Sequence, residues 1–324
     1  MPDKMTNKPI ARALQFSLLA LLLCALCVSS PLRSALNSSP PTRPKITGID
    51  HVRIYVSDIE KSREFYSKLF GIRLKGGMCF DTSNRCFTVG WAHDQTIDIE
   101  QAPTAGTRDL LAEIAIATDN IEQMRNYLVS NGVAATKITK DNYGKSLLDA
   151  HFEVRDPEGH LMSFIQRSAF PVDDPPPGAP WYVQIIHAGF VVHDRAAEDK
   201  FYKDILGFHV YWHGGMKDDE TNWVDMQVPD GTDWIEYMLN VPAGADKHTL
   251  GVMNHIALGV KDIHAAEAQL RKNGWSGNEQ PKIGRDGKWQ LNLYDPDNTR
   301  VELMEFIPVE KPCCSEYTGP HPRQ

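Results

Sequence analysis

The stretch "IDHVRIYVSDIEKSREFYSKLFGIRL" (residues 49–74) recurs, without a gap, as "IIHAGFVVHDRAAEDKFYKDILGFHV" (residues 185–210). His51 aligns with His187 at an offset of 136 residues, and a Phe-Tyr pair and a glycine align at the same offset. In both copies an alternating apolar segment precedes an amphipathic one, which predicts a strand followed by a helix. A repeat of this length indicates an internal duplication.

Each copy is itself built from two similar halves. "EIAIATDNIEQMRNYLVSNGV" (residues 113–133) aligns with "HIALGVKDIHAAEAQLRKNGW" (residues 255–275), and "RDPEGHLMSF" (residues 155–164) aligns with "YDPDNTRVEL" (residues 294–303). Every half begins with a strand, continues into a helix and ends with further strands. The sequence therefore predicts an α+β fold of four βαβββ modules, arranged as a tandem pair.

The turns and the proline-rich stretch divide the chain. "DPEG" and "DPDN" are turns that enter a last strand, where Gly159 and Asn298 can adopt a positive φ. We expect an N-terminal domain over 46–168 and a C-terminal domain over 182–309. The predicted connecting segments are a linker over 31–45, a proline-rich linker over 169–181 and a tail over 310–324.

Residues 1–30 are typical of a secretory signal peptide. Basic residues precede a mostly apolar run of about 15 residues, Leu14–Val28, and small residues follow it. The run is short for a membrane span, which needs about 20 residues. We expect export to the periplasm or the exterior, with an uncleaved membrane anchor as the alternative.

Composition limits the partners. The net charge is −8, with 42% hydrophobic and 23% charged residues. A folded protein is expected, and no basic stripe is present to bind the phosphates of nucleic acid. We expect a small-molecule substrate, no nucleic acid, no membrane contact for the mature domains, and a monomer or homodimer.

The cysteines outside the signal segment form two pairs. Cys79 and Cys86 flank a turn-rich segment, so two alternatives stay open in an oxidising compartment: a disulfide between them or two unpaired thiols. Cys313 and Cys314 are adjacent. Because adjacent cysteines rarely bridge well, we interpret them as unbridged tail residues without a metal role.

Four titratable residues occupy equivalent places in the two halves of the second copy. His187 and His255 lie in opening strands, and Glu236 and Glu302 lie in closing strands. Apolar neighbours flank each glutamate, which predicts inward-facing carboxylates that would be costly to bury without a partner. Two imidazoles and two carboxylates suit a divalent cation: Zn, Fe, Mn, Ni or Co. Beside His255, the small residues Ala257 and Gly259 are expected to leave room for the open side of the metal.

The repeats resemble the vicinal oxygen chelate superfamily of glyoxalases, bleomycin-resistance proteins and extradiol dioxygenases. The resemblance rests on the "H…FY…LG" opening and the "DP-turn…E" ending, and covers residues 46 to 308 approximately. It implies two half-barrel domains, with metal ligands on the first and last strand of each module. In the second copy these positions are His187, Glu236, His255 and Glu302.

The first copy departs from this pattern. At the aligned positions it has His51, Glu100, Glu113 and Ser163. One histidine, two carboxylates and a serine form a weaker metal site. We therefore interpret the first copy as degenerate and structural, and place the active centre in the second.

The resemblance implies three candidate functions. A glyoxalase-like enzyme would use the metal to polarise two vicinal oxygens and stabilise an enediolate, while Glu302 or Glu236 moves a proton. An extradiol dioxygenase with Fe(II) is the first alternative, although Asn292 stands where those enzymes generally have a tyrosine and residues 282–290 contain no histidine. A non-catalytic binding module is the second alternative. Its predicted cleft residues are aromatic: Tyr211, Trp212, Trp223, Trp234 and Trp289.

Overall fold

The computed structural model describes residues 41–70, 73–74, 86–88, 95–142, 148–167 and 182–323. The predicted signal peptide (1–30), the proline-rich linker (169–181) and Cys79, hence any Cys79–Cys86 bridge, lie outside the described residues. Within the described ranges, no helix has the length and apolar character needed to cross a membrane.

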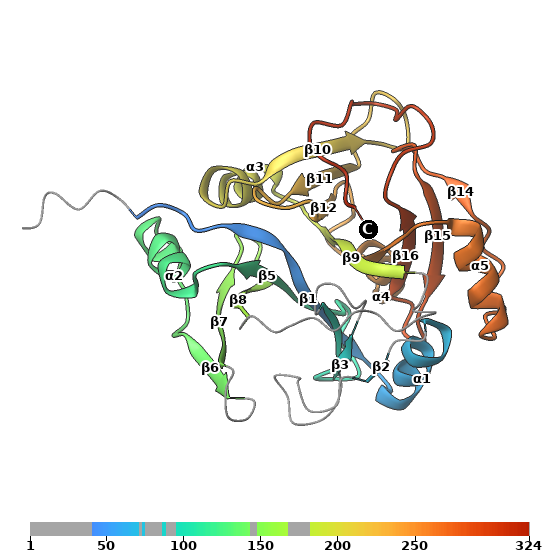
Figure 1. Cartoon of the computed structure of the whole chain (residues 1–324), viewed down its shortest axis with the longest axis horizontal. Helices are drawn as coiled ribbons and strands as arrows, with labels where there is room; N and C mark the ends of the chain where they lie inside the picture. The colour runs from blue at the N-terminus through green and yellow to red at the C-terminus, as the bar shows by residue number, and fades with distance from the viewer. Residues whose placement is uncertain are drawn as a thin grey trace, which may run out of the picture. The chain divides into compact units, whose positions relative to one another are not determined.

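Two eight-stranded sheets with the same strand order form the fold (Figure 1). The first runs β2-β3-β4-β1-β5-β8-β7-β6, and the second runs β10-β11-β12-β9-β13-β16-β15-β14. Each sheet combines two βαβββ modules and curls into a half-barrel, which confirms the predicted fold class. The first copy contains β1 (Ile46–Val56), α1 (Ile59–Phe70), β2 (Arg73–Leu74), β3 (Cys86–Thr88), β4 (Thr96–Gln101), β5 (Leu111–Thr118), α2 (Ile121–Ser130), β6 (Thr139–Asn142), β7 (Leu148–Arg155) and β8 (Leu161–Gln166).

The second copy repeats this order with one additional short helix between its modules. Its elements are β9 (Tyr182–Val191), α3 (Arg195–Asp199), the π-helix η1 (Lys200–Ile205), β10 (His209–Gly214), β11 (Trp223–Gln227), β12 (Trp234–Met238), α4 (Lys247–Met253), β13 (His255–Val260), α5 (Ile263–Lys272), β14 (Lys282–Ile283), β15 (Trp289–Tyr294) and β16 (Arg300–Glu305). In both copies the two opening strands pair antiparallel in the middle of the sheet.

Strand alternation separates the two faces of the second sheet. Ile256, Leu258 and Val260 are fully buried in a core that also contains Ile263 and Leu270 of α5. Burying each such side chain stabilises the fold by about 1.5–3 kcal/mol. The intervening residues of β13 face the inside of the half-barrel, where Ala257 belongs to a separate cluster with Trp212, Trp234 and Met304.

The turns before the last strands have the predicted backbone conformation. Gly159 has a φ of 94° and Asn298 a φ of 69°. Both therefore lie in the left-handed region, which glycine and asparagine adopt more readily than other residues.

Each of these turns docks on the first helical segment of the other copy. Tyr66 OH donates to Asp295 Oδ2 (3.3 Å), and the aligned Tyr202 OH donates to Asp156 Oδ2 (3.2 Å). Beside these contacts, backbone amides at the two helix starts donate to Asp297 Oδ2 (2.7 Å) and Glu158 Oε1 (2.7 Å). The Phe-Tyr and Asp-Pro motifs that mark the repeat therefore build two equivalent junctions between the copies.

Residues 310–323 lie against the edge of the second sheet. Thr318 N donates to Tyr211 O (3.0 Å), Trp212 Nε1 donates to Cys313 O (3.1 Å), and Gln227 Nε2 donates to Pro320 O (2.9 Å). The segment predicted as a tail is thus tied along β10 and β11.

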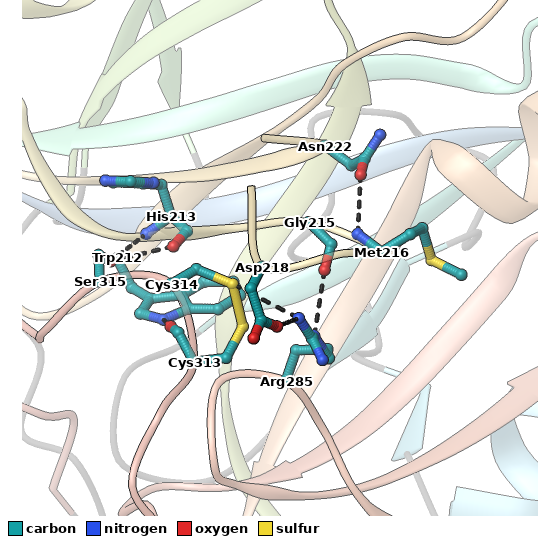
Figure 2. Close-up of a disulfide and its surroundings, with 10 residues drawn as sticks. All are labelled: Trp212, His213, Gly215, Met216, Asp218, Asn222, Arg285, Cys313, Cys314 and Ser315. Atoms are coloured by element: carbon teal, nitrogen blue, oxygen red, sulfur yellow. Dashed lines mark hydrogen bonds and ion pairs between the residues drawn. A yellow bond between two sulfur atoms is a disulfide. The ribbon is translucent and has the colours of Figure 1, made fainter. Parts of the chain in front are cut away.

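The expectation for Cys313 and Cys314 was wrong, because these two residues form a disulfide (Figure 2). Ser315 N donates to Cys313 O (2.7 Å), and Cys314 between them has a φ of 69°. This three-residue turn folds the chain back at the pair. Contacts with the sheet hold the chain in this turn, and the local sequence contains no motif that predicts it.

Removing the tyrosine hydroxyls should test the junctions. In Tyr66→Phe the buried Asp295 Oδ2 loses its donor, so the free energy of unfolding should fall by about 1–2 kcal/mol. Tyr202→Phe should cost less, because His160 Nδ1 still contacts Asp156 Oδ2 (2.7 Å). Urea unfolding measures both, with the exposed Tyr294→Phe as control. Equal or negligible losses in both variants would contradict the proposed role of the hydroxyls.

Candidate metal centre

The four predicted ligands come from four neighbouring strands. In the order β12-β9-β13-β16, each strand contributes one residue to the inner face of the half-barrel. The register places both Glu236 and His255 beside Gly189, and places both His187 and Glu302 beside Ala257. Residues up to 115 positions apart in the sequence are thereby gathered at one place on the sheet.

Their ligand atoms converge. His187 Nε2 lies 3.0 Å from His255 Nε2, which is itself 3.0 Å from Glu236 Oε2. Glu302 Oε2 lies 3.7 Å from His255 Nε2. His187, Glu236 and His255 each offer one atom within 4.8 Å of the others, so these three residues are a possible metal site with Glu302 at its edge.

Local contacts orient the two imidazoles. His255 Nδ1–H donates to Met253 O (2.8 Å), which leaves the Nε2 lone pair directed into the centre. The His187 ring packs on Trp234 with centroids 4.8 Å apart. Position 189 must be glycine, because a Cβ there would lie 2.0 Å from His255 Cε1.

The expectation for Gly259 was wrong. A Cβ at this position would meet Phe306 Cε1 at 2.3 Å, so the space beside Gly259 is filled by that aromatic ring. The residue that makes room at the centre is Gly189, on the neighbouring strand. In the antiparallel register of β9 and β13, the residue directly beside His255 is Gly189 of β9.

Burial sets the protonation of the centre. It lowers the pKa of His187 and of His255 well below the usual value, so both imidazoles are neutral at pH 7. It also raises the pKa of Glu236 and of Glu302 to about 7. Neutral imidazoles and carboxylates that are costly to bury as anions fit a divalent cation, so the donor set passes this chemical test.

A cavity of about 330 Å³ lies over the centre. Of the predicted cleft residues, Trp212, Trp223 and Trp234 line it, while Tyr211 is buried behind Trp234 with ring centroids 5.2 Å apart. The prediction that Trp289 lines the cleft was wrong. It packs against His264 with ring centroids 4.9 Å apart and belongs to the core on the helix side of the sheet.

Several polar residues that line the cavity, including Arg300 and Asn292, were not predicted from the sequence as site residues. Arg300 and Asn292 line the cavity beside Glu302, and Asn292 is its register partner on β15. A residue two positions from a ligand on a strand shares its face, so alternation alone could have indicated Arg300. Its Nε has no hydrogen-bond partner among the described residues.

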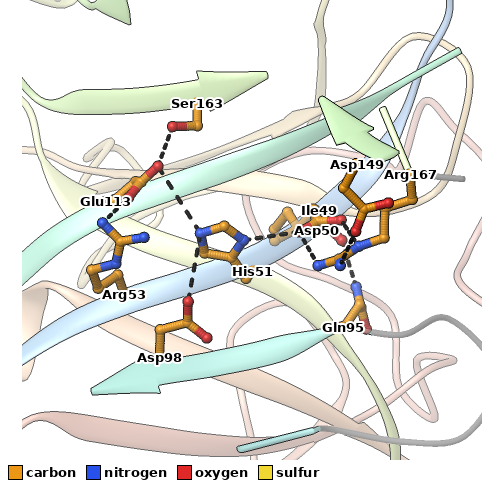
Figure 3. A network of polar contacts seen from close by, with 10 residues as sticks. All are labelled: Ile49, Asp50, His51, Arg53, Gln95, Asp98, Glu113, Asp149, Ser163 and Arg167. Atoms are coloured by element: carbon orange, nitrogen blue, oxygen red, sulfur yellow. Dashed lines mark hydrogen bonds and ion pairs between the residues drawn. The ribbon is translucent and has the colours of Figure 1, made fainter. Parts of the chain in front are cut away.

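The corresponding place in the first copy holds a different polar network (Figure 3). His51 Nε2 lies 3.9 Å from Asp98 Oδ2 and 4.0 Å from Glu113 Oε1. The prediction of Glu100 was wrong: Asp98 stands opposite Arg53 as Glu236 stands opposite Gly189. The offset between the copies changes from 136 to 138 residues in this strand, because the connection before it differs in length by two.

This network contains its own cation, Arg53, which occupies the position of Gly189. Arg53 Nη1 lies 2.7 Å from Glu113 Oε2, and Ser163 Oγ donates to Glu113 Oε1. Burial opposes charge on His51, but nearby carboxylates, Asp98 first among them, outweigh it and raise its pKa. The raised pKa of His51 and the Arg53 guanidinium beside Glu113 distinguish this cluster from the second-copy centre.

Known proteins share this architecture. The sequence profile of the glyoxalase/bleomycin resistance protein/dioxygenase superfamily matches residues 48–164 and 184–303. A lactoylglutathione lyase of Haemophilus influenzae is 28% identical over 125 residues, which are 38% of this chain and 93% of that protein.

Solved structures are similar over most of the chain. A mutant homoprotocatechuate 2,3-dioxygenase of Brevibacterium fuscum superposes with a TM-score of 0.61 at 19% identity, covering 82% of this chain and 73% of that one. The enzyme of the same name from Arthrobacter globiformis gives 0.59 at 19%, covering 83% and 82%. At such identities the likeness shows the fold alone.

The pKa values of the histidines in the two clusters should be shifted in opposite directions from the ordinary value, upward for His51 and downward for His187 and His255. In metal-free protein, imidazole NMR shifts should show His51 titrating above about pH 6.5, and His187 and His255 remaining neutral below it. Because the folded-state pKa of His51 is raised, its stabilisation is complete below about pH 6.5 and is lost as pH rises through the folded pKa.

Urea-unfolded protein is the control, since all three histidines should then titrate near 6.5. A folded-state His51 that loses its proton below this value would contradict the electrostatic account of the first copy.

Proposed function

The chain belongs to the glyoxalase/bleomycin resistance protein/dioxygenase superfamily, and from this membership we propose that its second copy is a metal-dependent, glyoxalase-like enzyme. Its substrate would be a small molecule with two vicinal oxygens. The observation that carries the proposal is the pair of carboxylates, Glu236 and Glu302, flanking two neutral imidazoles at the floor of one cavity.

The residues that would hold the cation are His187, Glu236, His255 and Glu302. A mixed set of nitrogen and carboxylate donors suits Zn, Fe, Mn, Ni or Co. When bound, the cation supplies Lewis-acid polarisation of the vicinal oxygens.

The two carboxylates are suited to proton transfer. Without a bound cation, burial raises the pKa of each to about 7, so a carboxylate that leaves the metal can accept or release a proton near neutral pH. Both line the cavity, from opposite sides of His255. One carboxylate can therefore take a proton from a carbon next to a carbonyl, and the other, in its protonated form, can donate its own proton to the neighbouring carbon. Arg300, beside Glu302, supports negative charge on the substrate oxygens.

The dioxygenase alternative is less well supported by the cavity. Iron oxygenases of the facial-triad type use two histidines and one carboxylate and keep the other positions open. Here Glu236 provides a second carboxylate at 3.0 Å from His255 Nε2. Among the described cavity residues, His187 is the one histidine, and it belongs to the centre itself.

We also propose that the substrate is not a glutathione adduct. The support is the predicted export signal in residues 1–30, because glutathione adducts are formed in the cytosol. The tryptophans at 212, 223 and 234 give the cavity an apolar wall, which favours a substrate with an aromatic or aliphatic group beside its vicinal oxygens.

Metal content tests the centre directly. His255→Ala should bind one divalent ion fewer per chain than the wild type, measured by elemental analysis after purification. Gly189→Ala should lose the same ion, because the added Cβ displaces the His255 ring. His51→Ala is the matched control in the first copy and should retain the wild-type content. Equal metal content in His255→Ala and wild type would refute a second-copy centre.

Deuterium incorporation tests the reaction. Hemithioacetals of small 2-oxoaldehydes with thiols other than glutathione should be converted in D₂O with deuterium at the carbon next to the carbonyl. Glu302→Gln should lower kcat by about 10²–10⁴-fold, as expected for loss of a general acid–base group. Elemental analysis of the variant separates this loss from loss of metal. Oxygen uptake with a catechol would instead establish a dioxygenase, and metal-independent binding without turnover would establish a binding module.

A further inference from the structure

A second group of ligand-type side chains lies at one junction between the copies. Asp156 and His160 belong to the turn between β7 and β8, and Glu198 belongs to α3 of the other copy. Each offers one ligand atom within 4.8 Å of the other two. None of them lines the cavity above the second-copy centre.

One carboxylate oxygen of Glu198 is left without a partner by the hydrogen bonds of the junction. Its side chain is 0% exposed, and its Oε1 accepts from Glu158 N (3.0 Å). Its Oε2 is buried without a hydrogen-bond partner among the described residues. A buried carboxylate oxygen with no donor is costly unless a cation compensates it.

The neighbouring residues complete a suitable donor set. Asp156 Oδ2 contacts His160 Nδ1 at 2.7 Å, so an imidazole nitrogen and a carboxylate oxygen already meet at this point. The His160 side chain is 19% exposed, which gives an ion a route from solvent and a place for a water ligand. Zn²⁺ and similar divalent ions accept histidine nitrogen and carboxylate oxygen as ligands, and water can supply the fourth position.

The equivalent junction provides an internal comparison. There, Asp295 receives Tyr66 as Asp156 receives Tyr202. The positions of Glu198 and His160 are taken by Ser62 and Thr299. Since the same docking forms with a serine and a threonine, a glutamate and a histidine are not required for docking.

We propose that Asp156, His160 and Glu198 bind a second divalent cation of the Zn²⁺ type, which links the last turn of the first copy to α3 of the second. The site has no residue in common with the second-copy centre. Its role is structural, because the ion would join two segments that meet at a junction between the copies.

The test uses the full chain with the second-copy centre disabled. Chelator-treated His187→Ala/His255→Ala protein is titrated with Zn²⁺ by calorimetry and with Co²⁺ by its visible absorption. One ion per chain should bind, and Zn²⁺ should raise the Tm. Adding Glu198→Ser and His160→Thr, the residues of the equivalent junction, should abolish both effects. Ser62→Ala in the same background is the control and should leave the stoichiometry unchanged.

Should the Ser/Thr replacement fail to fold, Glu198→Gln preserves the shape of the side chain and should weaken the ion at least tenfold. No ion bound by the His187→Ala/His255→Ala protein, or an ion that survives loss of Glu198 and His160, would overturn the proposal. The first of these results would identify the group as a hydrogen-bonded cluster that holds no ion. The His187 and His255 changes are present throughout, so failure here is independent of the proposed enzyme function.

Discussion

The antiparallel pairing of β9 with β13, in the middle of the second sheet, sets Gly189 opposite His255. The hydrophobic effect fixes this register, because Ile256, Leu258 and Val260 must face the helices. A slip of one residue would expose that stripe to the cavity and turn the histidine into the core. With the register fixed, the parallel neighbours β12 and β16 bring one carboxylate to each side of the imidazoles. The polar centre is thus positioned by apolar burial on the opposite face.

The two copies show how one framework carries two kinds of chemistry. Their strand orders are identical, yet Gly189 in the second copy is replaced by Arg53 in the first. The glycine admits a neutral imidazole at the centre of its sheet, whereas the arginine adds a fixed positive charge beside Glu113. The second-copy cluster therefore lacks a cation of its own at this position, whereas the first-copy cluster contains the Arg53 guanidinium. The difference lies in side chains, since the backbone pairing is shared.

The internal repeats and the alternation of apolar and polar residues allowed much of the fold to be predicted from the sequence. The four modules, the positive φ of Gly159 and Asn298, and the inward positions of the second-copy ligands followed from these patterns. The gap-free alignment gave Glu100 the position that Asp98 holds in the structure, because such an alignment cannot detect a two-residue difference in the preceding connection. The position of Trp289 was mispredicted because tertiary packing decides which face of the sheet this side chain joins. The Cys313–Cys314 bridge was missed because packing also decides which turn the two cysteines form. The group at Asp156, His160 and Glu198 joins two copies and has no signal within either.

The two junctions close over very different lengths of chain. Tyr202 and Asp156 are 46 residues apart, whereas Tyr66 and Asp295 are 229 apart. During synthesis, the short junction can form as soon as η1, which carries Tyr202, has emerged, but Tyr66 of α1 must wait until Asp295 has been made. Contacts between residues so far apart in the sequence slow folding, because the chain loses loop-closure entropy before the contact contributes any stability. The helix α1 can therefore pack on its own copy early, but its Tyr66 reaches its hydrogen-bond partner only late in synthesis.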